Sequence, residues 1–149
     1  MRTWDLGLAL EASVSQRISL AQAQAAVAAA IEEARKDSRG MAAAVVDEHG
    51  DLICCARMDG VPERVQRFAI RKAYTAAVMG RDTLVFKRDM QQAERTLADY
   101  GDPNFTTLQG GLVVRSEGQV IGGLAVGGNT SERDEEVARI ALRALGIES

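Results

Sequence analysis

Two pairs of apolar runs constrain the fold of this chain more than any other feature of its sequence. Residues 41–60, MAAAVVDEHGDLICCARMDG, hold two runs that are separated only by Glu48–Asp51. Residues 110–128, GGLVVRSEGQVIGGLAVGG, repeat that arrangement around Ser116–Gly118. Short apolar runs joined by such turns are typical of β-hairpins, and hairpins build antiparallel sheets. The sequence therefore predicts a central antiparallel β-sheet.

Helical patterns flank the two hairpins. Ser19-x-x-Gln22 is a capping-box pattern, and strong helix formers follow it as far as Gly40. A second helix is expected over residues 61–80, which place Pro62 at the first helical position and a glycine at the end.

Further helical pieces are expected before and after the second hairpin. Residues 83–100 read as one or two of them, and Ser131 is expected to cap a final helix whose first turn is acidic. The order α-β-β-α-α-β-β-α lacks alternating βα units. It predicts an α+β domain, in which helices flank the antiparallel sheet.

Length and composition fit one soluble domain. Of the 149 residues, 1–18 are interpreted as an N-terminal extension and 19–149 as a single domain. Asp5 and Glu11 interrupt the apolar N-terminus, which makes it a poor signal peptide, and no run is long enough to span a bilayer. We therefore expect a cytoplasmic protein that has no membrane partner.

Nucleic acid is not an expected partner either. The formal net charge is −3, and basic residues are interleaved with acidic ones rather than gathered into a patch. Aromatic residues make up only 4% of the chain, which leaves few side chains for stacking on bases.

The histidine and cysteine content argues against a metal site. His49 is the only histidine and falls in a predicted hairpin turn, and the only cysteines, Cys54 and Cys55, are adjacent. Neighbouring side chains on a strand point to opposite faces, so these two thiols should not converge on one ion. They are interpreted as packed strand residues, and the open alternative is one thiol that faces a pocket.

Two features suggest a ligand pocket without identifying the ligand. The glycines at 122, 123, 127 and 128 lack nucleotide-loop spacing, and are interpreted as allowing close backbone approach or unusual φ. A small carboxylate or neutral ligand could lie over them. Lys72 shares the apolar face of its helix, so it either extends past that face to solvent or points into a cleft. Arg57 and Asp59 stand where the strand leaves the sheet and could line the mouth of a pocket.

Several of these blocks resemble one known family. The hairpin segment 41–60, AIRKAYTAA at 69–77, the hairpin segment 110–128 and DEEVA at 134–138 look like the GlcG/HbpS family, also called the haem-degrading or DUF336 domain. The resemblance runs from about Ser19 to Leu145. The positions that match the family pattern are Asp47, Gly50, Arg57, Asp59, Gly60, Lys72, Ala73, Gly110, Gly111, Gly118, Gly122, Gly127 and Asp134.

The resemblance implies a profilin- or PAS-like domain and homo-oligomers built from dimers. Family members include haem-binding proteins, some with haem-degrading or redox-sensing roles, and a domain of corrinoid adenosyltransferases. The histidine that haem-binding members carry in the N-terminal helical region is absent here. No cofactor is therefore firmly implied, although haem stays open as one.

Three functions are consistent with these residues and with the resemblance. The first is a metal-independent enzyme of the isomerase, hydratase or lyase type that acts on an organic acid or aromatic catabolite. Its pocket would lie between the sheet and the 61–80 helix. Lys72 or Arg57 would hold a substrate carboxylate or enolate, and Asp59 or Tyr74 would move a proton. The ligand is expected to be a carboxylate, and the residues expected to bind it are Arg57, Gly122, Gly127, Gly128 and Asn129.

The second function is haem binding, and the third is a non-catalytic sensor or accessory subunit. For haem, the side chains available as axial ligands are His49, Cys54 or Cys55, Met58 and Tyr74.

Overall fold

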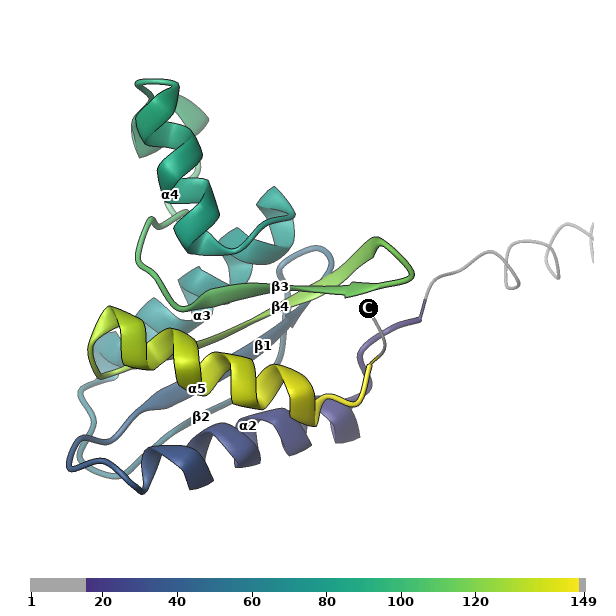
Figure 1. The fold of residues 1–149 in the computed structure, drawn as a ribbon, viewed down its shortest axis with the longest axis vertical. Helices are drawn as coiled ribbons and strands as arrows, with labels where there is room; N and C mark the ends of the chain where they lie inside the picture. The colour runs from purple at the N-terminus through teal and green to yellow at the C-terminus, as the bar shows by residue number, and fades with distance from the viewer. Residues whose placement is uncertain (1–15, 148–149) are drawn as a thin grey trace, which may run out of the picture.

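The fold is a four-stranded antiparallel sheet with helices on both faces (Figure 1). The computed structural model describes residues 16–147. The strands are β1 (Ala42–Asp47), β2 (Leu52–Arg57), β3 (Gly111–Ser116) and β4 (Gln119–Gly127), and their order in the sheet is β2-β1-β4-β3. Both predicted hairpins are present, and β1 pairs with β4 in the centre. The expected α+β class is confirmed.

The helices form one layer on each side of the sheet. Figure 1 shows α2 (Leu20–Ala34) and α5 (Ser131–Ala144) together on one face and α3 (Glu63–Met79) on the other. The larger apolar core lies under α2 and α5, and a second core, rich in alanine, lies between α3 and the sheet. Helix α4 (Thr83–Gln92) and the 3₁₀ helix η1 (Leu97–Tyr100) project beyond these layers.

Local sequence signals determine where the helices begin. The Ser19 hydroxyl accepts from the Gln22 N–H while the Gln22 side chain accepts from the Ser19 N–H, so the predicted capping box is present. The prediction that Ser131 caps the last helix was wrong by one residue. The cap is Thr130, whose hydroxyl accepts from the Arg133 N–H, and Ser131 is the first helical residue.

The glycine pair in the middle of β4 allows the sheet to contact its neighbours closely. A Cβ at Gly123 would collide with the Ala73 carbonyl oxygen of α3, and a Cβ at Gly122 would collide with the Val46 carbonyl oxygen of β1. Glycine at these positions is therefore a packing requirement. It brings the backbone of α3 against β4 and so fixes the height of α3 side chains above the sheet.

No helix in the described part of the chain is both long and apolar enough to cross a membrane. Residues 1–15, most of the predicted N-terminal extension, lie outside the described residues.

Candidate ligand site at Lys72

Lys72 is buried on α3 and points into a cleft. The residue is only 3% exposed, and its ammonium donates to the Val126 carbonyl oxygen at 2.9 Å and to Asp134 Oδ2 at 3.1 Å. The sequence left two alternatives open for this side chain, and the structure shows the inward one. An ammonium has three N–H donors, and these two contacts use two of them.

Asp134 is the partner that sequence reasoning did not assign to the site. It lies in the first turn of α5, where its Oδ1 accepts from the Asn129 N–H at 2.9 Å. Burial raises the pKa of the Asp134 carboxyl, and the nearby Lys72 charge opposes that rise. Burial likewise lowers the pKa of Lys72 against the opposing effect of Asp134. Each charge in this pair therefore depends on the other.

A cavity of about 290 Å³ opens beside the Lys72 ammonium. Gly127, Gly128 and Asn129, three of the positions expected to contact a ligand, lie in its wall. A Cβ at Gly127 would stand 3.6 Å from Lys72 Nζ, and a Cβ at Gly110 would stand 3.0 Å from it. Gly127 therefore leaves space on the cavity side of the ammonium, whereas Gly110 allows the backbone to pack closely against Lys72, Val126 and Asp134.

The cavity has a positive lining. Arg39, Arg64 and Lys72 are its three cationic residues, and Asp134 is the one carboxylate. Arg39 precedes β1 and Arg64 lies in the first turn of α3, so segments far apart in the sequence bring their charges to one opening. Sequence reasoning singled out neither arginine as a site residue.

A second cavity of about 340 Å³ adjoins the first. The two share Arg39, Arg64, Val65 and Gly128, and Asp59 lies in the wall of the second. Of the residues predicted to move a proton, Asp59 is thus next to the Lys72 cavity but not in its wall.

Tyr74 lies elsewhere. Its O–H donates to Asp102 Oδ2 at 2.6 Å, and its ring packs against Phe105 with centroids 5.8 Å apart. The pKa of the Tyr74 phenol is raised, mainly by that hydrogen bond and to a smaller extent by burial. Tyr74 is not among the residues that line the Lys72 cavity. Positions 72 and 74 are about 200° apart around a helix, which explains the separation.

Two other predicted ligand-contacting residues also lie outside the Lys72 cavity. Gly122 packs against Val46 and Ile18, five residues along β4 from Gly127. Arg57 is exposed at the end of β2.

The residues considered as haem ligands are dispersed. His49 is exposed in the β1–β2 turn, where its Nε2 lies 3.4 Å from Glu48 Oε1. Cys54 packs against the α2/α5 core and Cys55 against the α3 core, on opposite faces of the sheet as predicted. Met58 accepts a hydrogen bond through its Sδ from the Met41 N–H at 3.3 Å. None of the four lines the Lys72 cavity.

Metal ligands do not cluster in the described residues. Within 16–147, no group of three or more His, Cys, Asp or Glu side chains is arranged to hold a metal ion.

Comparison with known proteins identifies relatives of known fold. The family model for haem degrading protein HbpS-like matches residues 18–143. Protein GlcG of Escherichia coli K12 is 36% identical over 109 residues, which are 73% of this chain and 80% of GlcG. Corrinoid adenosyltransferase PduO of Salmonella typhimurium is 27% identical over 121 residues, which are 80% of this chain and only 36% of PduO.

Two solved structures have the same fold over most of their length. A double mutant of Streptomyces reticuli HbpS has a TM-score of 0.81 and 32% identity, with 90% of each chain covered. A complex of PduOC with heme has a TM-score of 0.80 and 26% identity, with 89% of this chain and 98% of that one covered.

Proposed function

The chain belongs to the HbpS-like family, and we propose that it binds a small anionic ligand beside Lys72. The ligand class that we favour is an organic or aromatic carboxylate. The observation that carries this proposal is the buried Lys72 ammonium, which faces a cavity and has a donor beyond its contacts with Val126 and Asp134.

The charges of the site favour an anion. A carboxylate next to Lys72 would accept its third N–H, and charge-assisted hydrogen bonds of this kind are stronger than neutral ones. Arg39 and Arg64 add two guanidinium groups at the same opening. Gly127 has no side chain where a Cβ would stand 3.6 Å from the ammonium, which leaves room for a ligand on that side.

The same arrangement supports metal-independent isomerase, hydratase or lyase chemistry as the finer proposal. Fixed cations stabilise negative charge that develops on an enolate during proton abstraction next to a carboxylate. Lys72 would hold the carboxylate or enolate oxygen, and Asp59 in the adjoining cavity would move the proton. Asp134 would keep Lys72 oriented through its ion pair.

A thermal-shift screen tests the binding proposal. Acetate, succinate, benzoate and 4-hydroxybenzoate are suitable probes, and at least one should raise the melting temperature of the wild-type protein. Arg64→Gln should reduce the shift because it removes a cation from the opening. Arg71→Gln is the matched control, since Arg71 is an exposed arginine of the same helix that does not line the cavity. A shift that Arg64→Gln leaves unchanged would contradict the site.

Turnover separates an enzyme from a non-catalytic accessory subunit. Any probe that binds is incubated with the protein in deuterated water and followed by proton NMR. Loss of a proton signal next to the carboxylate, or a new product, would support the enzyme. Binding without either change would favour the accessory role.

Haem is the second candidate, and the similarity to the PduOC:heme structure favours it. The residues weighed as axial ligands do not lie in one site in this structure, so no ligand pair is assigned and no step is routed through haem. Haemin titration of the purified protein decides the matter. A sharp Soret band that saturates at one haem per subunit or per dimer would support haem binding. Broad absorbance without saturation would indicate adventitious surface binding.

Matched variants then locate any saturable haem site. If His49→Ala abolishes the band, the exposed turn supplies a ligand. If His49→Ala and Lys72→Ala both leave it unchanged, neither residue holds the haem. Assembly from dimers also stays a prediction for this chain, and sedimentation analysis is its direct measurement.

A further inference from the structure

The cations of the Lys72 cavity lie at two depths. Lys72 is only 3% exposed, whereas Arg39 and Arg64 are exposed residues at the opening. The adjoining cavity shares both arginines with the first and adds Asp59 to the wall. A ligand that enters this cleft therefore meets one cation at its buried end and two at its open end.

The segment that carries Arg39 is anchored on both sides of that residue. Asp37 Oδ2 accepts from Arg133 Nε of α5 at 2.8 Å. A Cβ at Gly128 would stand only 2.6 Å from the Gly40 carbonyl oxygen, so glycine at 128 lets this segment lie directly against the end of β4. Arg39 is thereby held close to the opening.

The first turn of α3, which carries Arg64, packs on the same end of β4. A Cβ at Gly127 would stand 3.4 Å from the Val65 carbonyl oxygen, and a Cβ at Gly128 would stand 3.4 Å from Val65 Cγ1. Two segments that are distant in the sequence thus meet over one pair of glycines. Their arginines converge for that reason.

Both arginines are available to an anion. Within the described range 16–147, no carboxylate lies at ion-pair distance from Arg39 or Arg64, whereas Arg133 has three carboxylate partners. Burial raises the pKa of the Asp134 carboxyl, and the Arg39 charge is among those that oppose the rise. The Arg39 charge is therefore close enough to act on the buried end of the cleft.

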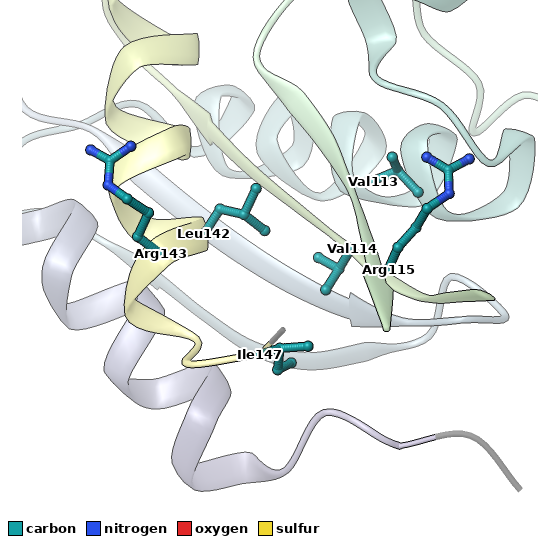
Figure 2. Close-up of a pocket in the computed structure, with 6 residues that line it drawn as sticks. All are labelled: Val113, Val114, Arg115, Leu142, Arg143 and Ile147. Carbon is teal, nitrogen blue, oxygen red and sulfur yellow. The ribbon is translucent and has the colours of Figure 1, made fainter. Parts of the chain in front are cut away.

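A third cavity also has arginines in its lining, but it is not arranged for an anion. It has a volume of about 340 Å³, lies between β3 and the end of α5, and is lined by Val113, Val114, Arg115, Leu142, Arg143 and Ile147. Figure 2 shows apolar side chains facing this space, while Arg115 and Arg143 extend away from it. Arg115 instead donates to the Gly80 carbonyl oxygen. The convergence of cations therefore distinguishes the Lys72 cavity.

We propose that the ligand of the Lys72 cavity is a dicarboxylate whose second carboxylate binds Arg39 and Arg64. This inference rests on the carboxylate site proposed above and extends it. The first carboxylate accepts the remaining N–H of Lys72, and the second lies at the opening, where a guanidinium can donate two parallel hydrogen bonds to it.

The lining of the Lys72 cavity suits such a ligand in charge and in polarity. Three cationic residues and one carboxylate, Asp134, give it a formal charge of +2, which two ligand carboxylates balance. Phe68 and Leu108 add apolar surface to the same wall, which suits the hydrocarbon part between the two carboxylates. An acid with one carboxylate would leave the guanidinium groups without a partner.

Calorimetric titration with matched ligands tests the proposal. Succinate, glutarate and adipate are each compared with their monomethyl esters at one ionic strength, so that several chain lengths are covered. The wild-type protein should bind at least one diacid about tenfold more tightly than its ester. Arg39→Gln/Arg64→Gln should remove most of that preference. Arg71→Gln, the exposed control on α3, should keep it.

The outcomes separate this inference from the proposed function. A preference that is lost in Arg39→Gln/Arg64→Gln and kept in Arg71→Gln supports the dicarboxylate, provided that urea unfolding shows both variants to be folded. Equal binding of every diacid and its ester overturns the dicarboxylate but leaves the carboxylate site at Lys72 standing. A preference that survives the loss of both arginines overturns it too. Inorganic phosphate that binds as tightly as the best diacid would assign the cleft to a compact dianion instead. If no acid or ester binds, both proposals fail.

Discussion

Lys72 on α3 and Asp134 on α5 form a buried ion pair beside the end of β4, with 3.1 Å between Nζ and Oδ2. The two helices lie on opposite faces of the sheet, and the Val126 carbonyl oxygen of β4 accepts from the same ammonium. The pair therefore joins the two helical layers at the place where the cleft opens. This contact connects the stability of the fold to the proposed ligand site.

Breaking this pair from one side should be costly. Lys72→Met leaves the Asp134 carboxylate buried without its counter-charge, and such changes destabilise proteins by about 3–5 kcal/mol. Lys72→Met/Asp134→Asn removes both charges, so it should be less destabilised than Lys72→Met alone. Urea unfolding of the wild type, Lys72→Met, Asp134→Asn and the double variant measures the four free energies that the comparison needs. A double variant as unstable as the sum of its single variants would contradict the coupling.

Two glycines of β4 should respond differently to alanine. Gly127→Ala places a methyl group 3.6 Å from Lys72 Nζ, at ordinary contact distance, so the fold should persist while ligand binding is weakened. Gly123→Ala would collide with the Ala73 backbone, and overpacking of this kind costs about 1–3 kcal/mol. Unfolding and thermal-shift measurements on both variants compare the effects. Equal loss of stability would show that Gly127 is a packing residue too.

The Tyr74–Asp102 contact predicts a pH dependence in the alkaline range. A raised pKa means that the folded state holds the phenol proton more tightly than the unfolded state does. The stability from this contact should be complete below the ordinary tyrosine pKa of 10.0 and should be lost as pH rises through the raised value.

Tyr74→Phe tests that dependence. The variant should be less stable than the wild type at neutral pH, and the difference should shrink as pH rises above the ordinary tyrosine pKa. Tyr100→Phe is the control, since it removes a phenol from the same aromatic cluster. Unfolding curves at stepped pH values provide the comparison. A difference that stays constant with pH would contradict the interpretation.

The Cys55 thiol should react slowly. Burial raises its pKa, so less of it is present as the reactive thiolate at neutral pH. In the Cys54→Ala variant, the remaining Cys55 should react with Ellman's reagent more slowly than free cysteine does. A rate equal to that of free cysteine would show that the thiol is accessible and would reopen the possibility that it faces a pocket.

The elements of the fold followed from local patterns in the sequence. The hairpin at Glu48–Asp51 and the cap at Ser19 depend on residues within a few positions of one another. The observed cap of the last helix, Thr130, is one residue before the predicted cap, Ser131. Both are good capping residues, and only the backbone conformation distinguishes them.

The site followed from the sequence only in part. Lys72 and Asp134 are 62 positions apart, and no local pattern connects them. Helical periodicity alone could have predicted that Tyr74 and Lys72 lie on different faces of their helix. The distance along the strand could have predicted that Gly122 and Gly127 do not line the same site, since five residues of strand span about 17 Å. Arg39 carries no pattern of its own, and only the folded chain brings it to the cleft.

The most direct test of the central claim is an amide NMR titration of the wild-type protein with a carboxylate that binds, such as benzoate or succinate. Ligand binding beside Lys72 should produce the largest shift changes at Gly127, Gly128 and Asn129, because these residues line the cleft and the Asn129 N–H donates to Asp134. The largest changes at Tyr74 or Arg57, with these three amides unmoved, would contradict it.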